Sequence, residues 1–315
     1  MGDRQGRHRP VHLHRLRLAS GRQRHGDQGR GRLRGRPPLT RVLVTGASGA
    51  LGRVVAALAA DAGHEVVGTR VTKVVPDTRV RDRLLDVRDR YAVQRLLEEE
   101  APDVVVHTAY RQESWAVTAV GAAHVALAAA ACGARLVHVS SDVVFSGATV
   151  TYTEDAEPDP VSPYGAAKAA AEVAVAAVAP DAVVARTSLV MGRPGAPMER
   201  RVADLLSGRA TGVLFDDDVR CPVHVDDLAA ALLELAFSDA TGVRHVAGPD
   251  ALSRFQIGEL IAQRDGADPF VLQRGSRREA GVPGPLDVRL DGTWTQSTLR
   301  TRLRGAREFL APPFS

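Results

Sequence analysis

The sequence predicts an α/β protein, in which a parallel β-sheet carries helices on both faces and a smaller, less regular lobe follows it. From residue 39 to residue 190, short apolar segments rich in valine alternate with segments of helical periodicity. The predicted strands are continuous apolar runs, which is typical of parallel sheets buried on both faces. Beyond residue 190 this alternation becomes irregular, and 315 residues are enough for both parts to build a sizeable core.

The elements of the first part follow one another in the order strand, helix, strand. Strands are expected at 41–45, 64–70, 84–87, 103–109, 134–141 and 182–190. Helices are expected from near Leu51, over 89–100, over about 113–132 and over 163–178. Because strand–helix–strand crossovers are right-handed, such units form a doubly wound sheet of the Rossmann type. Residues 39–190 are therefore predicted to be a dinucleotide-binding domain.

The second part, residues 191–315, is predicted to form a substrate-binding lobe. It contains helical segments near 198–208, 225–237 and 253–263, and two short apolar segments near 212–215 and 242–246. Whether these two strands belong to the lobe or return to the main sheet is left open. Since ligands of open α/β sheets bind at the carboxyl ends of the strands, we expect the lobe to cover that edge.

The first 38 residues differ in composition from the rest. They hold eleven arginines and two aspartates, a net charge of +9, whereas the remaining residues carry 30 basic and 35 acidic side chains. This segment has too little apolar surface to order itself, so we expect a disordered arm or upstream sequence translated from a misassigned start codon. It lacks interleaved aromatic residues, and no specific nucleic-acid partner is predicted.

The cysteine count and the hydropathy pattern exclude further classes. Two cysteines cannot cross-link a secreted scaffold, so a reducing, cytoplasmic location is expected. No apolar run of about 18 residues occurs, which argues against a membrane span. The six histidines after residue 38 do not cluster with cysteines or carboxylates at the spacing of metal ligands, so no metal site is predicted.

A glycine-rich turn follows the first predicted strand. Gly46 permits a tight turn, Gly49 lets backbone amides approach a pyrophosphate, and Gly52 allows close helix–strand packing. The expected cofactor site includes Gly46, Ser48, Gly49, Ala50, Leu51 and Gly52. A turn that needs glycine only for its backbone conformation is the alternative, but the position between a strand and a helix favours a dinucleotide.

The end of the second strand indicates which dinucleotide binds. An NAD site places an acidic residue there, about 20 residues after the glycine turn, to bind the ribose hydroxyls. This chain has Arg70 instead, with Lys73 nearby. Two cations would attract a 2′-phosphate, so NADP(H) is predicted and NAD(H) remains the alternative. A solvated surface arginine is the plainer interpretation of Arg70.

The segment Ser162-Pro163-Tyr164-Gly-Ala-Ala-Lys168 carries the predicted chemistry. Ser162 and Pro163 are typical of a helix start, and a helix places Tyr164 and Lys168 on one face. With four tyrosines and two lysines in the chain, this spacing is expected by chance only about 0.03 times. We expect Tyr164 to protonate a carbonyl oxygen as hydride arrives, while Lys168 lowers the pKa of the phenol and holds the nicotinamide ribose.

The GxxGxxG spacing and the Tyr-x-x-x-Lys pair resemble the short-chain dehydrogenase/reductase superfamily, and its extended, nucleotide-sugar-modifying branch in particular. This resemblance implies a catalytic hydroxyl at Ser141, for which a strand-end serine that satisfies local backbone is the alternative. It also implies an adenine contact by Asp86 and Val87. The segment beneath the cofactor would be Thr108, Ala109 and Tyr110.

A narrower resemblance covers about Arg41 to about Leu310. The segments TGASGALG, PDVVVHTAY, VSSDVVFSG, SPYGAAK, ARTSLVMG, RCPVHVDDLA and PLDVRLD, in this order, are similar to those of the dTDP-4-dehydrorhamnose reductase family. Three positions depart from the family pattern: Val143 and Leu189 stand where the family has aromatic residues, and an asparagine is replaced near Gly121. The resemblance places Asp142, Val143, Leu189 and Arg220 at the substrate.

The segment RCPVHVDDLA contains Arg220 and the start of a predicted helix. Arg220 is expected to bind a substrate phosphate, or to pair with one of the aspartates at 216–218. In the His224-Val-Asp226-Asp227 segment, the resemblance implies that an aspartate caps the next helix.

The predicted function is the NADPH-dependent reduction of a keto group on a nucleotide-activated deoxysugar of the dTDP-4-keto-6-deoxyhexose type. A dehydratase would need a glutamate where Val143 stands, so elimination is disfavoured. A hydride-recycling epimerase and an NADP-binding regulatory subunit without catalysis remain alternatives. A homodimer is left open.

Overall fold

The structure is a computed structural model and describes residues 40–193 and 195–312. The arginine-rich segment 1–38, expected to be disordered, lies outside the described residues. The segment from residue 39 onward forms one unit that holds the sheet and the lobe. In the described part of the chain, no helix is both long and apolar enough to cross a membrane.

Seven parallel strands form the main sheet, in the spatial order β12-β7-β5-β4-β1-β2-β3. Their bounds are β1 Arg41–Thr45, β2 Glu65–Arg70, β3 Val80–Leu84, β4 Val104–His107, β5 Arg135–Ser141, β7 Val183–Thr187 and β12 Gly242–His245. The order runs outward in both directions from β1 and β4, which pair with each other. The doubly wound fold is thus confirmed, and its switch point lies where these two strands end.

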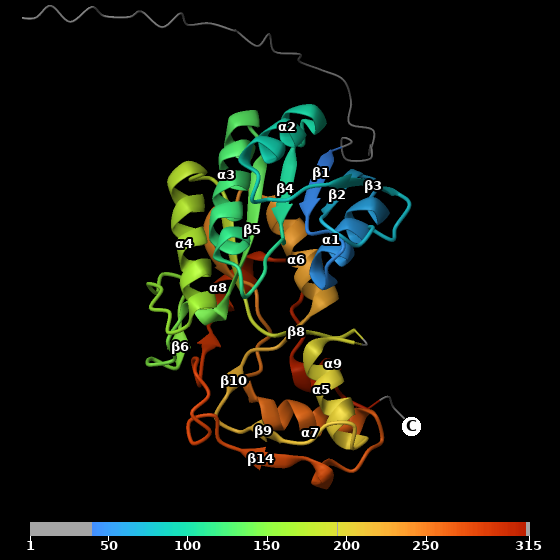
Figure 1. Ribbon diagram of the computed structural model, residues 1–315, viewed down its shortest axis with the longest axis vertical. Helices are drawn as coiled ribbons and strands as arrows, with labels where there is room; N and C mark the ends of the chain where they lie inside the picture. The colour runs from blue at the N-terminus through green and yellow to red at the C-terminus, as the bar shows by residue number, and fades with distance from the viewer. Residues whose placement is uncertain (1–39, 194, 313–315) are drawn as a thin grey trace, which may run out of the picture. The chain divides into compact units, whose positions relative to one another are not determined.

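Helices cover both faces of the sheet (Figure 1). Helices α1 (Ala50–Asp61) and α6 (Val225–Ala236) lie on one face, where they bury Val55 and Leu232 with apolar side chains of β1, β4 and β5. The other face carries α2 (Arg90–Glu100), α3 (Gly121–Cys132) and α4 (Pro163–Val178). One turn of π-helix, Ala116–Val120, precedes α3. The strands are buried on both sides, as their continuous apolar runs predict.

The third strand differs from the prediction of 84–87. The strand is β3, which covers Val80–Leu84, and Leu85 and Val87 are buried beside the sheet without belonging to it. β3 is polar because it is the edge strand: Arg81 and Arg83 form ion pairs with glutamates of α2. An edge strand with charged side chains has no apolar run by which the sequence could reveal it.

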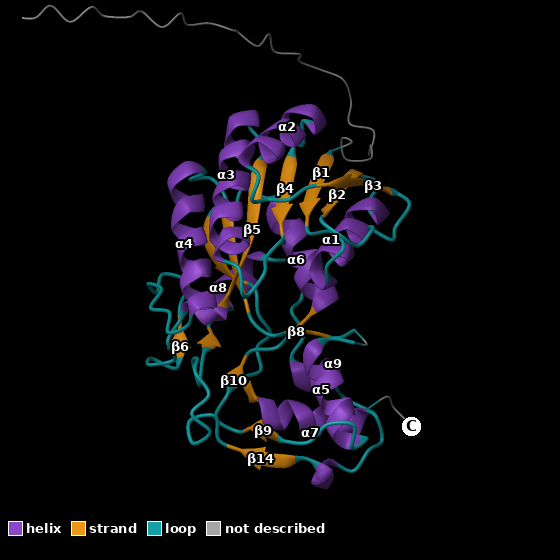
Figure 2. Cartoon of the chain, viewed as in Figure 1, coloured by secondary structure: helices purple, strands orange, loops and turns teal. Residues whose placement is uncertain are grey.

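The lobe has its own apolar core, which includes side chains of α5 (Pro197–Leu206) and α7 (Arg254–Arg264). Figure 2 shows the lobe below the sheet. The remaining helices are α8 Thr293–Thr298 and α9 Ala306–Phe309. Of these, α8 lies beside the edge strand β12, where Arg244 stacks on Trp294. Eight two- or three-residue strands pair as β9 (Val213–Phe215) with β14 (Gln273–Gly275), β10 (Val219–Arg220) with β13 (Leu252–Ser253), β8 (Val190–Met191) with β11 (Val223–His224), and β6 (Thr151–Tyr152) with β15 (Arg289–Leu290). Among the described residues, two short 3₁₀ turns cover Asp142–Val144 and Pro269–Val271.

The chain crosses between the two parts more than once. The segment 225–237, expected in the lobe, is the helix α6 that packs on the main sheet. The strand near 242–246 is β12 and extends this sheet beside β7, whereas the strand near 212–215 pairs within the lobe. The chain therefore leaves the sheet domain after β7, returns for α6 and β12, and leaves it again, so one boundary at residue 190 does not describe it.

Candidate active site

The glycine turn lies between β1 and α1 and is packed tightly against the end of β4. Gly46 has a φ of +68°, and a Cβ there would lie 2.9 Å from the Cα of Ala109. A Cβ at Gly52 would lie 2.3 Å from the carbonyl oxygen of Gly46 and 2.7 Å from Oγ1 of Thr108. Both positions exclude any larger residue, because backbone atoms cannot move aside. Gly49 is exposed at the tip, where a Cβ would lie 3.1 Å from the Gly46 oxygen.

The N-terminus of α1 faces outward from this turn. Gly49 is its N-cap residue, and among the described residues no side chain caps the helix or places an acid in its first turn. Ser48 is half-buried and Ala50 is exposed, so the first backbone amides of α1 lie at an accessible surface. Such amides, with the positive end of the helix dipole, suit an anionic group.

The segment beneath this turn is fixed by hydrogen bonds to β1. The Thr108 hydroxyl donates to the carbonyl oxygen of Thr45 at 2.7 Å, and the amide of Ala109 donates to the Thr45 hydroxyl oxygen. Tyr110 follows directly, and its ring is half exposed to solvent. Thr108, Ala109 and Tyr110 thus lie beside the glycine turn, at the switch point of the sheet.

Helix α4 begins as predicted. Ser162 is its N-cap, with its side chain accepting a hydrogen bond from the amide of Gly165 at 3.1 Å, and Pro163 is its first residue. Gly165 is required because a Cβ there would lie 2.1 Å from the carbonyl oxygen of Val143. This close approach brings Tyr164 to the turn that follows β5.

The Tyr164 hydroxyl lies among Ser141, Tyr110 and Asp142. Burial raises the pKa of Tyr164 above its ordinary range, Tyr110 and Asp142 raise it further, and hydrogen bonding with Ser141 lowers it. The rings of Tyr110 and Tyr164 have centroids 5.9 Å apart. The sequence predicts that Lys168 lowers the pKa of Tyr164. In the structure the pKa of Tyr164 is raised instead, so the phenol is protonated at neutral pH.

Lys168 lies one turn further along α4 and is buried. Its Nζ donates to the carbonyl oxygen of Val139 on β5 at 2.8 Å, and it lies 5.1 Å from the centroid of the Tyr110 ring. Burial lowers the pKa of Lys168 to about 8, while the charge of Glu172 raises it. The structure thus brings Ser141, Tyr164 and Lys168 together at the carboxyl end of β5.

Asp142 belongs to a buried cluster that the sequence reveals only in part. Its Oδ2 accepts a hydrogen bond of 2.6 Å from the hydroxyl of Ser188, a residue absent from the prediction. Arg220 is buried, lies 3.6 Å from Asp142 and 3.1 Å from Asp218, and donates to the carbonyl oxygens of Pro285 and Leu286. Of the two interpretations of Arg220, the structure shows the pairing with a neighbouring aspartate, Asp218. No local pattern marks Ser188, whose partner lies 46 positions away.

Arg70 forms an ion pair that the sequence did not suggest. Its Nε lies 2.9 Å from a carboxylate oxygen of Asp82, which stands on the adjacent strand β3. In residues 40–193 and 195–312, the Nη groups of Arg70 make no hydrogen bond. Lys73 is exposed on the loop after β2. Arg70 and Lys73 thus both lie at the carboxyl end of β2, and Asp82 orients the Arg70 side chain.

The remaining predicted residues lie around this centre. Asp86 forms an ion pair with Arg88 at 2.6 Å, which lowers the pKa of Asp86, and Val87 is buried beneath it. Val143 is half-buried in the turn after β5, and Leu189 packs at the edge of the lobe core.

The cap of α6 differs from the expectation. His224 is the N-cap residue, and its Nδ1 accepts the amide hydrogen of Asp226 at 3.2 Å. Asp226 and Asp227 are in the first turn of the helix, and Asp227 instead holds Arg304 through an ion pair of 2.7 Å. An imidazole nitrogen replaces the carboxylate as the acceptor.

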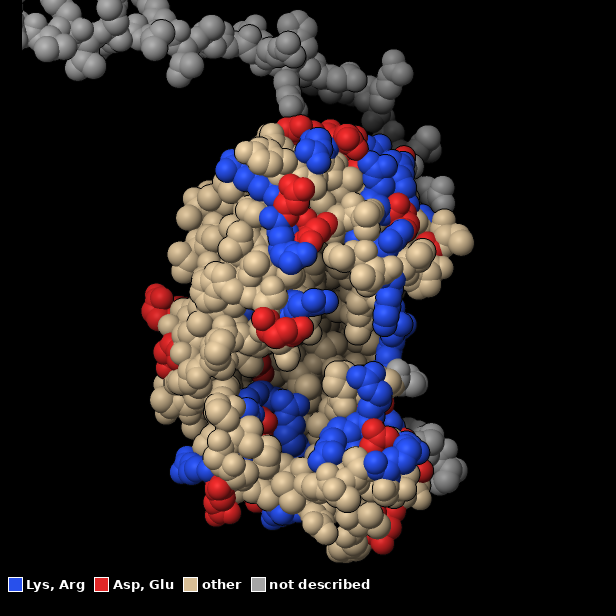
Figure 3. Space-filling model, viewed as in Figure 1, with Lys and Arg blue, Asp and Glu red and all other residues tan. Residues whose placement is uncertain are grey.

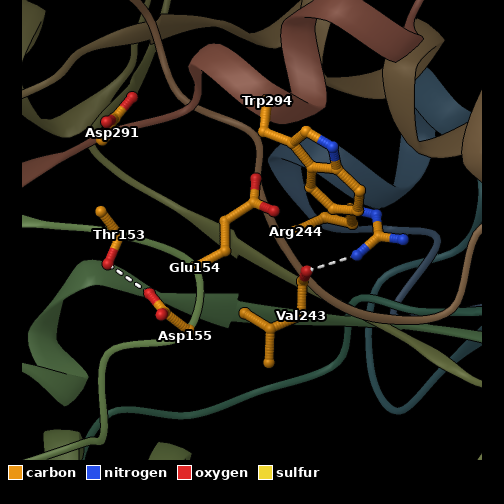
Figure 4. A pocket seen from close by; sticks show the side chains of 7 residues that line it. All are labelled: Thr153, Glu154, Asp155, Val243, Arg244, Asp291 and Trp294. Carbon is orange, nitrogen blue, oxygen red and sulfur yellow. Dashed lines mark hydrogen bonds between the residues drawn. The ribbon is translucent and has the colours of Figure 1, made fainter.

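A cavity of about 500 Å³ lies elsewhere, at the outer edge of the sheet (Figure 4). It is lined by Thr153, Glu154, Asp155, Val243, Arg244, Asp291 and Trp294. Glu154 accepts the amide hydrogen of His245, and Arg244, stacked 4.2 Å from the Trp294 ring, donates to the Val243 oxygen. Glu154 and Arg244 thus hydrogen-bond to backbone groups of the edge strand β12.

The space-filling view shows a hollow between the sheet and the lobe, with Lys and Arg side chains along its lower rim (Figure 3). The carboxyl ends of the central strands point toward this hollow (Figure 2). Within the described ranges, no group of three or more His, Cys, Asp or Glu side chains could hold a metal ion. The arrangement therefore offers an anion-binding turn, a phenol, an ammonium and a hydroxyl at one edge of the sheet.

Comparisons with known proteins give a family and several relatives. The family described as the RmlD substrate binding domain matches residues 40–311. A dTDP-4-dehydrorhamnose reductase of Mycolicibacterium smegmatis is 34% identical over 286 residues, which cover 86% of this chain and 84% of that protein. A methionine adenosyltransferase 2 subunit beta of Xenopus laevis is 29% identical over 308 residues, which cover 87% of this chain and 88% of that protein.

The fold is shared with solved structures. The crystal structure of a dTDP-4-dehydrorhamnose reductase from Bacillus anthracis str. Ames, in complex with NADP, matches with a TM-score of 0.73 and 23% identity over 86% of this chain and 97% of that one. At 23% identity, this likeness shows a shared fold and no more. With the family match over residues 40–311, it leads to one conclusion: the chain belongs to the RmlD substrate binding domain family.

Proposed function

We propose that this protein is an NADPH-dependent oxidoreductase that reduces a keto group of a nucleotide-activated deoxysugar. The observation that carries the proposal is the convergence of Ser141, Tyr164 and Lys168 at the carboxyl end of β5, beside the glycine turn. Phenol, ammonium and hydroxyl together can hold a carbonyl oxygen and protonate it. Membership of the reductase family supports the same reaction class.

The residues at the switch point fit a dinucleotide. The tight packing of Gly46 and Gly52 leaves room for a phosphate only above the turn, where Gly49 and the first amides of α1 are accessible. Arg70 and Lys73 lie where a 2′-phosphate would be bound, and the Asp82 carboxylate holds the Arg70 side chain in place. When bound, the nicotinamide supplies the hydride.

The chain's own residues supply the proton and hold the reacting oxygen. Ser141 donates a hydrogen bond to the substrate carbonyl oxygen and Tyr164 gives this oxygen its proton, so that the C=O group becomes CH–OH. The raised pKa of Tyr164 keeps the phenol protonated until substrate binds. Lys168 then stabilises the tyrosinate by its positive charge, and the phenol regains a proton from solvent.

The substrate class rests on relatives named dTDP-4-dehydrorhamnose reductase. We propose a dTDP-4-keto-6-deoxyhexose bound in the hollow between the sheet and the lobe. Val143 and Leu189 are aliphatic and half-buried, so a sugar bound beside them would meet no aromatic ring from these two positions. Asp142 is buried in the cluster with Ser188 and Arg220, where it shapes the site behind Tyr164.

A regulatory subunit that binds NADP without reducing a sugar is the second candidate. It is favoured by the similarity to methionine adenosyltransferase 2 subunit beta over 87% of the chain. A hydride-recycling epimerase is a third possibility, and it would require a cofactor that stays bound through turnover.

One experiment separates these functions. The purified chain is mixed with NADPH and a panel of dTDP-4-keto sugars, and the loss of NADPH absorbance is followed with the Tyr164→Phe variant as the control. A reductase consumes stoichiometric NADPH only with intact Tyr164. An epimerase converts the sugar without net NADPH loss, and a regulatory subunit binds NADPH by titration but converts no sugar.

A further inference from the structure

Helix α4 carries a third functional group on the face that holds Tyr164 and Lys168. Glu172 follows Lys168 by four residues, as Lys168 follows Tyr164, so the three side chains lie along one side of the helix. Lys168 and Glu172 are 3% and 5% exposed. A carboxylate so deeply buried needs partners, because desolvation strongly disfavours its charge.

The partners of Glu172 come from two strands. Arg186 on β7 donates from Nη2 to Oε2 at 2.8 Å and from Nε to both carboxylate oxygens, and the Ser140 hydroxyl on β5 donates to Oε1. Arg186 is itself buried, donates to the carbonyl oxygen of Ala156 at 3.0 Å, and lies 4.9 Å from the Phe145 ring. Glu172 is therefore held in one position.

The groups around Lys168 supply little other charge. His107 on β4 and His138 on β5 stack at 5.3 Å, and burial lowers the pKa of His107 to about 3 and that of His138 well below its ordinary value. Both imidazoles are neutral at physiological pH. Tyr110 presents its ring to the Lys168 ammonium, and Tyr164 is a neutral phenol.

Two further charged groups complete these surroundings. Asp142, after β5, acts on Tyr164, and Arg186 lies behind Glu172 on β7. Glu172 stands on the same helix as Lys168, whereas Arg186 reaches it from another strand. Of this pair, the charge of Glu172 raises the pKa of Lys168.

We propose that Glu172, fixed by Arg186 and Ser140, is a positioning residue for the reaction: its carboxylate keeps the buried Lys168 side chain in the charged form that the reaction requires. The proposal rests on the proposed function for its catalytic consequence. The effect of Glu172 on the protonation of Lys168 does not depend on the proposed function, because it can be measured without substrate. An ion pair that only fastened α4 to β7 would leave the protonation of Lys168 unchanged when removed.

The lysine content of the chain allows a direct test. Lys73 and Lys168 are its two lysines, so protein labelled with ¹³C at lysine Cε gives two side-chain NMR signals. The Lys73→Arg variant assigns them, and exposed Lys73 serves as an internal reference. We expect Lys168 to titrate near pH 8 in the wild type and at least one pH unit lower in Glu172→Gln, a tenfold change in the ratio of its two forms.

The control variants separate the carboxylate from its partner. In Glu172→Gln the cation of Arg186 is left without its partner and could by itself lower the midpoint, so Glu172→Gln combined with Arg186→Met removes both charges. We expect the midpoint of the double variant also to lie below that of the wild type. A double variant that titrates like the wild type overturns the proposal, as does an unchanged midpoint in Glu172→Gln.

Folding is checked by circular dichroism and thermal unfolding. If Glu172→Gln does not fold, Glu172→Asp replaces it, because aspartate keeps the charge but withdraws the carboxylate by one methylene. We then expect a lower Lys168 midpoint in Glu172→Asp, and an unchanged midpoint contradicts the proposal. Ser140→Ala removes one hydrogen bond and leaves both charges, so its midpoint should move less than that of Glu172→Gln.

The catalytic consequence is read from the pH profile of turnover. Activity should decline as pH rises through the Lys168 midpoint, and Glu172→Gln should move this decline to lower pH by the same amount, with little change in KM for the keto sugar. If the wild type reduces no keto sugar, the proposed function fails while the NMR titration still decides the role of Glu172. If turnover is present but its profile is the same in both proteins, the positioning role fails alone.

Discussion

The ammonium of Lys168 is hydrogen-bonded to the carbonyl oxygen of Val139 at 2.8 Å, which ties helix α4 directly to strand β5. The two residues after Val139 are Ser140, which binds Glu172, and Ser141, which lies at Tyr164. Three consecutive residues of one strand thus contact three residues of one helix. This alignment sets where the phenol stands relative to the end of the sheet.

Tyr164→Phe should reduce the rate of keto-sugar reduction by about 10²–10⁴-fold, because it removes the proton donor and keeps the ring. Steady-state NADPH oxidation measures the loss, and the dissociation constant for NADPH should stay within about twofold. A variant as fast as the parent would exclude Tyr164 as the acid.

Ser141→Ala should lower kcat by about 10²–10³-fold with little effect on NADPH binding, since it removes one hydrogen bond to the developing oxyanion. Ser146→Ala is a matched control, because Ser146 binds Asp159 outside the site. Equal losses in the two variants would mean that the effect comes from folding. Pre-steady-state hydride transfer is the appropriate measurement.

Lys168→Met should raise the free energy of unfolding at neutral pH although it damages turnover. Folding lowers the pKa of Lys168 from 10.5 to about 8, so between these values the unfolded chain binds more protons than the folded one. The stability of the wild type then rises with pH by up to about 1.4 kcal/mol per unit relative to the variant. Below pH 8 the difference is constant.

Urea unfolding of both proteins at several pH values from 7 to 10.5 measures this difference. A gap between the two unfolding free energies that stays constant through the whole range would show that Lys168 titrates normally in the folded state.

NADPH should bind more tightly than NADH by about 1.5–3 kcal/mol, because Arg70 and Lys73 provide charge-assisted hydrogen bonds to a 2′-phosphate. Arg70→Ala should remove most of this preference and leave NADH affinity nearly unchanged. Asp82→Asn tests the partner of Arg70, and Arg209→Ala in the lobe is the distant control. Equal dissociation constants for the two cofactors in the wild type would contradict the role of Arg70.

The elements whose causes are local could be predicted from residue type and order alone. The apolar run Arg41–Thr45, the glycine turn and α1 follow directly from residue type and order. The start of α4 is equally local, because Ser162 and Pro163 act within one helical turn, and the four-residue spacing places Tyr164 and Lys168 together. Continuous apolar runs also determined that the sheet is parallel and covered on both faces.

Contacts between residues far apart in the chain could not be predicted in this way, because they depend on the folded arrangement. β3 is polar and is recognisable as a strand only through its pairing with β2 and its ion pairs with α2. The return of α6 and β12 to the main sheet depends on packing that no local pattern encodes. The partners of Asp142 and Glu172 come from β5, β7, β10 and the segment after β7, which folding alone brings together. The sequence gives the charge of each side chain. The partner that stabilises a buried charge depends on distances in the folded chain. The pKa shift of Lys168 could therefore not be predicted without the fold.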